Sequence, residues 1–169
     1  GLFLWVSWWH IVNGASKTSL FLVLFCAAFL LHFVWEMWQI PFFVGMSEAT
    51  HWSAVIQCTR ATIGDGFIAL FAYVISAITV RDLYWLHNLR LRSWSLYLAV
   101  GLVTTIILEY FATEVYGRWQ YSESMPLTPI FGIGLAPFLQ WLLIPPVTLW
   151  IAAVFLRGLK EPGRASRRT

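Results

Sequence analysis

Acidic side chains occur within segments of this chain that are otherwise apolar enough to cross a membrane. They are Glu36, Asp65, Glu109 and Glu114. On insertion scales, a charged side chain near the centre of a membrane helix costs at least roughly 2.5–3.5 kcal/mol, so each acid needs a compensating role. The usual roles are a buried partner, a proton path or the lining of a polar cavity. We therefore expect the chemistry of this protein to take place around these carboxylates.

His32 and Glu36 are four residues apart, which places them on one face of a helix. Such a pair can exchange a proton with a substrate, or it can form a structural hydrogen bond between helices. Asp65 lies between Gly64 and Gly66, and small residues allow a neighbouring helix or a ligand to approach closely. We take His32, Glu36 and Asp65 as candidate catalytic residues.

Glu109 and Glu114 differ by five residues, or about 140° around a helix, so they do not both point into one narrow cavity. Glu109 is the deeper of the two and is the fourth catalytic candidate. Glu114 is expected to pair with Arg118 near the membrane surface. Arg60 either pairs with a buried acid or extends its guanidinium outwards.

Aromatic residues accompany the acids inside the apolar segments. Their faces could stabilise a cationic intermediate, because cation–π attraction strengthens away from water, although aromatic residues in membrane helices also serve plain packing. The residues expected to contact a substrate are Trp35, Trp38, Gln140, Trp141 and Arg60.

Metal and cofactor chemistry have little support in the sequence. The histidines are His10, His32, His51 and His87, and the chain lacks the two Glu-x-x-His motifs that a carboxylate-bridged di-iron site requires. Nucleotide and phosphate-binding fingerprints are also missing. Cys26 and Cys58 are expected at different depths, as packing residues rather than a disulfide. We therefore predict no metal, no cofactor and no nucleic-acid partner.

These residues must be positioned by membrane helices. Of the 169 residues, 59% are hydrophobic and only 11% are charged, which is more apolar surface than a small soluble domain can hide. We predict an all-α polytopic bundle in one domain. Its expected parts are a segment at 1–12 that is either a short apolar, interfacial helix or a fifth membrane helix, spans at 20–43, 54–80, 94–116 and 134–156, and a basic tail at 157–169.

The basic residues predict the orientation. They gather in the 81–93 loop and in the tail, and basic residues flanking spans mark the cytoplasmic side. The loops 45–53 and 117–132 would then face outwards. We expect the protein to reside in a bacterial inner (cytoplasmic) membrane. Counting about 1.5 Å per residue puts Glu36, Asp65, Glu109 and Gln140 in the outer half of the membrane, which predicts one shared site.

The order of these motifs resembles the EXPERA group, which includes the emopamil-binding sterol isomerase. The similarity lies in His32-Phe33-Val34-Trp35-Glu36, in Glu109 followed by Thr113-Glu114, and in Trp141 followed by Pro145. The resemblance implies a helical membrane enzyme that moves a double bond of a sterol-like substrate. The glutamate on the third helix of that group has no counterpart here, so Asp65 would substitute for it. Residues 117–126 instead resemble bacterial integral membrane proteins of unassigned function.

Three functions compete on this evidence. The first is an isomerase or cyclase that uses buried carboxylates for acid/base chemistry on an apolar isoprenoid or sterol-like substrate. The second is a non-catalytic subunit of a larger membrane complex that holds lipid, quinone or pigment. In the lipid bilayer, the expected assemblies are a homodimer or such a larger complex. The third is a proton-coupled carrier, which ranks last because the internal repeats common in transporters are not visible.

Overall fold

The computed structural model describes residues 16–158, which form a bundle of four long helices. They are α2 (Lys17–Trp38), α3 (His51–Val80), α4 (Leu91–Tyr110) and α5 (Leu135–Gly158). A π-helical turn, Phe111–Val115, extends α4. All four are long and apolar enough to cross a membrane, which confirms the predicted all-α membrane fold. The predicted 1–12 segment and most of the 157–169 tail lie outside the described residues.

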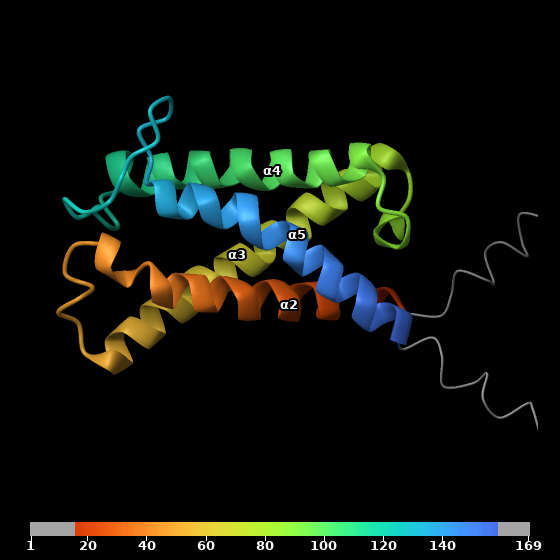
Figure 1. Cartoon of the computed structure of the whole chain (residues 1–169), viewed down its shortest axis with the longest axis horizontal. Helices are drawn as coiled ribbons and strands as arrows, with labels where there is room; N and C mark the ends of the chain where they lie inside the picture. Colours follow the sequence, from red (N-terminus) through yellow and green to blue (C-terminus); the bar gives the residue numbers. More distant parts are fainter. Residues whose placement is uncertain (1–15, 159–169) are drawn as a thin grey trace, which may run out of the picture.

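The four helices pack as two crossing pairs (Figure 1). α2 and α4 each pack against both α3 and α5, which cross between them. One end of the bundle carries the α2–α3 and α4–α5 connections, residues 39–50 and 116–134, and is called the two-loop end below. The opposite, one-loop end carries the α3–α4 connection. Most of the described basic residues at or near helix ends lie at this one-loop end, namely Lys17, Arg81, Arg90, Arg92 and Arg157, whereas Arg118 lies at the two-loop end.

Local signals set most helix boundaries. Ser16 and Thr50 cap α2 and α3 through side-chain oxygens that accept hydrogen bonds from Ser19 N (3.1 Å) and Ser53 N (3.3 Å). α2 ends at Trp38, five residues before the predicted exit, because Pro41 cannot continue an α-helix and the chain turns into a short 3₁₀ segment, Ile40–Phe42.

The prolines of the last span do not interrupt it, although a proline inside a helix removes a backbone hydrogen bond. α5 runs unbroken through Pro145 and Pro146. Pro137 lies in the first turn, where the backbone N–H groups have no partner within the helix in any case. All residues of α5 therefore lie on one continuous helix.

The apolar core occupies the half of the bundle nearer the one-loop end. Trp85, from the α3–α4 connection, stacks on Tyr73 with ring centroids 4.9 Å apart. Buried residues from the four helices surround them, including Leu20, Leu24, Tyr97, Leu149 and Leu156. This packing leaves the other half of the bundle for the polar residues.

Candidate functional site

Three titratable side chains meet around one amide in the half of the bundle nearer the two-loop end. Gln140 Nε2 on α5 lies 2.9 Å from His32 Nδ1, 3.1 Å from Glu36 Oε1 and 3.2 Å from Asp65 Oδ2. His32 Nδ1 is 3.5 Å from Asp65 Oδ2. His32 and Gln140 are almost fully buried, whereas 14% of the Asp65 side chain is exposed. The structure therefore brings His32, Glu36, Asp65 and Gln140 together.

The amide of Gln140 can serve more than one protonation state of its neighbours. Its nitrogen carries two hydrogens, so it donates to at most two of the three groups around it. A half-turn of the amide brings its oxygen to the same place, where it accepts from a protonated imidazole or carboxylic acid. The arrangement thus accommodates both a proton-poor and a proton-loaded set of acids.

Trp141 closes one side of this cluster. Its Nε1 donates to Asp65 Oδ1 at 3.4 Å, and its ring lies 5.1 Å from the imidazole of His32. Gly101 on α4 makes room for the indole, because a Cβ at that position would clash with the ring. Trp141 is itself only 1% exposed, so it contacts a substrate only where the substrate enters the cluster.

Gln39 adds a second amide that the sequence analysis missed. Its Nε2 donates to Glu36 Oε1 at 2.7 Å, while its Oε1 is buried without a partner. Gln39 follows Glu36 by three residues and His32 by seven, so the same helix-face spacing that paired those two could have included it.

Glu109 lies beside the cluster and is held by residues of the α4–α5 connection. Tyr121 OH donates to Glu109 Oε2 at 2.5 Å, and Trp119 Nε1 donates to the same oxygen at 3.3 Å. Glu109 is also close enough for its charge to interact with those of Asp65 and Glu36. No short-range pattern in the sequence marks Tyr121, because its link to Glu109 depends on the path of the connection.

Tyr121 lies outside the membrane-spanning helices and acts as a hydrogen-bond donor. Burial raises the pKa of its phenol well above the usual value, and the nearby Glu109 carboxylate raises this pKa further. The hydroxyl therefore keeps its proton across the physiological pH range. It can donate to Glu109 throughout that range.

The two connections at this end are joined over the cluster. Phe43 and Tyr121 form an antiparallel bridge, with Val44 N donating to Gln120 O (3.0 Å) and Ser122 N donating to Phe42 O (2.9 Å). Their rings lie 5.7 Å apart. The backbone on both sides of Tyr121 is thereby fixed, which holds its hydroxyl at Glu109.

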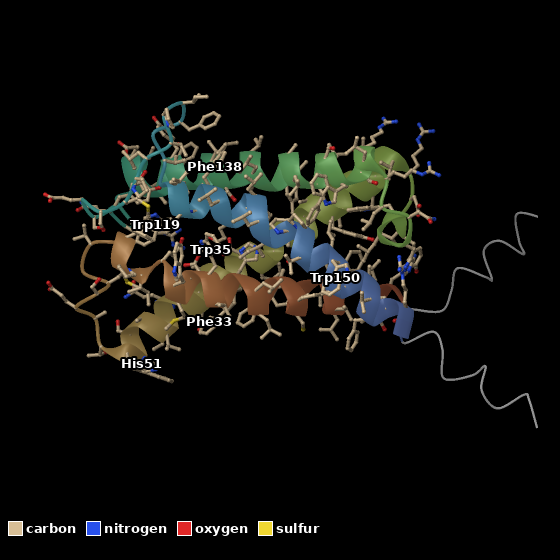
Figure 2. The ribbon with its side chains drawn as sticks, viewed as in Figure 1. Phe33, Trp35, His51, Trp119, Phe138 and Trp150 are labelled. Carbon is tan, nitrogen blue, oxygen red and sulfur yellow. The ribbon has the colours of Figure 1, made fainter. Side chains whose placement is uncertain are left out.

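The other predicted substrate contacts lie apart from the acids. Trp35 and Trp38 line an apolar groove of about 430 Å³ together with Leu31, Val34 and Ile144, between α2 and α5. Trp38 is 58% exposed, and Trp35 Nε1 is buried without a partner. Trp35 and Trp119 both lie in the half of the bundle nearer the two-loop end, whereas Trp150 lies in the other half (Figure 2).

Arg60 does not join the cluster. It is exposed on α3, and within residues 16–158 it forms no ion pair with any acid. The expected ion pair of Glu114 with Arg118 is likewise not formed in the described region, where both residues are exposed. Exposed pairs of this kind contribute only about 0–1 kcal/mol, so little favours their formation.

The described part of the chain has no group of three or more His, Cys, Asp or Glu side chains arranged to hold a metal ion. Cys26 and Cys58 are both free. Comparison of the chain with protein-family models, curated proteins and solved structures finds no match.

Proposed function

We propose that this protein is a membrane-embedded enzyme that performs acid/base chemistry on an apolar substrate of the isoprenoid or sterol-like class. The observation that carries the proposal is the meeting of His32, Glu36 and Asp65 at the amide of Gln140. Three titratable groups on two helices contact one amide on a third helix. A structural hydrogen bond between helices would need only one such group. Isomerisation or cyclisation by proton transfer needs no redox cofactor.

Such a reaction needs a proton donor and a proton acceptor held at fixed positions. Glu36 and Asp65 provide two carboxyl groups, and His32 provides an imidazole within 3.5 Å of Asp65. In this proposal, one carboxylic acid protonates a double bond and a second group of the cluster removes a proton from a neighbouring carbon. The face of Trp141, whose ring lies 5.1 Å from the imidazole of His32, would stabilise the cation formed between these steps.

The groove between α2 and α5 supports access from the membrane. Its lining is apolar, and it lies along α2, the helix that also carries His32 and Glu36. An apolar substrate would reach the acids from the lipid by this side. We further propose that the protein resides in a bacterial cytoplasmic membrane with its one-loop end facing the cytoplasm.

One observation favours the second candidate, a non-catalytic subunit of a larger membrane complex. Two apolar grooves are open on the surface of α2, and Phe25, Phe29 and Phe33 form a ladder of stacked rings on that helix. A partner helix could cover this surface. The buried acids would then stabilise the assembly of helices rather than catalyse a reaction.

Native mass spectrometry of the protein, extracted gently from its own membrane, separates the two candidates. The enzyme proposal expects a monomer or homodimer that carries an isoprenoid- or sterol-sized adduct. Glu36→Gln and Asp65→Asn should fold like the wild type and lose turnover once the adduct has identified the substrate. A stable assembly of several different chains, with no such adduct, would favour the subunit.

A further inference from the structure

We infer that Glu109 and Tyr121 form the proton entry path from the water at the two-loop end to the cluster of His32, Glu36 and Asp65. This inference rests on the proposed acid/base function, because an enzyme that protonates its substrate must exchange protons with water. It assigns a proton-relay role to Tyr121, which the sequence did not mark.

The position of Tyr121 fits a relay between water and the bundle interior. Tyr121 is half-buried in the connection outside the spans, and its hydroxyl donates to Glu109 Oε2 at 2.5 Å. Glu109 belongs to α4 and interacts electrostatically with Asp65 and Glu36. The two residues therefore link the loop surface to the cluster.

Glu109 is free to gain and lose a proton. Its recorded donors, Tyr121 OH and Trp119 Nε1, are both neutral, and no basic side chain forms an ion pair with it within residues 16–158. An ion pair would hold a carboxylate in its charged form. The charged groups that act on this pair are Asp65 and Glu36 from the cluster side and Glu114 on the Tyr121 side.

The opposite direction leads into the apolar core. Towards the one-loop end, the cluster is followed by Ala28, Ala69 and Trp141, and then by the core around Tyr73 and Trp85. Within residues 16–158, no hydrogen bond links the hydroxyls of this core, such as those of Tyr73 and Tyr97, to the cluster. The two-loop end is therefore the side from which protons can arrive.

The transfer balances without any other reactant. Tyr121 passes its hydroxyl proton to the Glu109 carboxylate and takes a proton from water, so the phenol stays neutral. Glu109, now protonated, gives its proton to Asp65 or Glu36, with which it interacts electrostatically, and becomes a carboxylate again. One proton moves inwards, and one hydroxide remains at the loop surface.

The test is the rate of proton uptake by the cluster after a pH drop, followed by infrared spectroscopy of the purified protein in lipid nanodiscs. Carboxylate and carboxylic acid groups absorb at different frequencies, and the signal lost in Glu36→Gln and Asp65→Asn belongs to the cluster. No substrate is needed. Failure of this inference is therefore distinguishable from failure of the proposed function.

Tyr121→Phe keeps the ring and removes only the hydroxyl. We expect this variant to slow proton uptake by about ten-fold or more while its final extent stays the same. Tyr116→Phe is the matched control, because Tyr116 is exposed at the same end and its recorded contact is ring stacking with Phe111, which Phe preserves. Uptake in this control should match the wild type.

Glu109→Gln is the second variant, and it decides the question if Tyr121→Phe does not fold. A glutamine can still accept from Tyr121 but cannot carry the proton, so uptake by the cluster should slow as in Tyr121→Phe. Wild-type uptake rates in either folded variant would overturn the inference. An equal slowing in Tyr116→Phe would also overturn it, because the effect would then not be specific to the Tyr121 hydroxyl.

Discussion

Gln140 Nε2 on the last helix lies 2.9 Å from His32 Nδ1 on the first described helix, 108 residues away in the sequence. The same nitrogen also reaches a carboxylate from each of two helices, so one amide connects α2, α3 and α5. These contacts lie on the side of the bundle away from the apolar core. Gln140 is therefore the residue on which the arrangement of the acids depends.

Gln140→Leu should destabilise the protein, because it removes the shared donor and leaves two buried acids and an imidazole without it. We expect a loss of about 1–3 kcal/mol in the free energy of unfolding, measured by chemical denaturation in mixed micelles. Gln57→Leu is the control, since Gln57 is exposed and donates only to Ser53, at 3.3 Å on its own helix. Equal stability of the two variants would contradict a central role for Gln140.

Gly101→Ala should disturb the cluster through Trp141. A Cβ at Gly101 meets the indole ring of Trp141, which donates to Asp65, so either the ring or α4 must shift. Overpacking of this kind costs about 1–3 kcal/mol. The measurements are the free energy of unfolding and the tryptophan fluorescence of the folded protein.

Gly64→Ala is the matched control for that substitution. Gly64 is also a helical glycine, but a Cβ there meets nothing within 4 Å. Alanine favours helix over glycine by up to about 1 kcal/mol, so this variant should be neutral or slightly more stable. If Gly101→Ala were as stable as Gly64→Ala, the result would contradict the close packing of α4 on Trp141.

The spacing of residues along each helix was enough to predict part of the site. The four-residue separation of His32 and Glu36 predicted a shared face, and counting residues from the helix ends placed Asp65 and Gln140 at a similar depth. These predictions succeed because rise and rotation in an α-helix are fixed. The early end of α2 departed from the prediction because Pro41 prevents the helix from continuing.

The rest depended on how the helices are rotated and how the loops close. Arg60 lies on the same helix as Asp65, yet it is exposed. The five residues that separate Arg60 from Asp65 did not settle which way the arginine faces. Tyr121 reaches Glu109 only because its connection pairs with residues 42–44 of another loop. Contacts of this kind arise from tertiary packing, which no local pattern in the sequence encodes.

The proposed orientation can be tested with single cysteines in a Cys26→Ala, Cys58→Ala background. Glu123→Cys lies at the two-loop end and Asn88→Cys at the one-loop end, and both sites are exposed. A maleimide that cannot cross membranes should label the Glu123→Cys variant in intact spheroplasts, because the basic end of the bundle is retained in the cytoplasm. It should label the Asn88→Cys variant only after lysis, and the reverse pattern would invert the proposed topology.

Deuterium exchange into membrane lipids tests the central claim most directly. An enzyme that adds a proton to a substrate and removes another incorporates deuterium when the water is D₂O, whatever the identity of the substrate. Wild-type protein in nanodiscs made from its native lipid extract should shift the mass of one isoprenoid or sterol-like species, and Glu36→Gln and Asp65→Asn should abolish that shift. If no lipid gains more deuterium with the wild type than with these variants, the buried cluster does not perform acid/base chemistry on a membrane substrate.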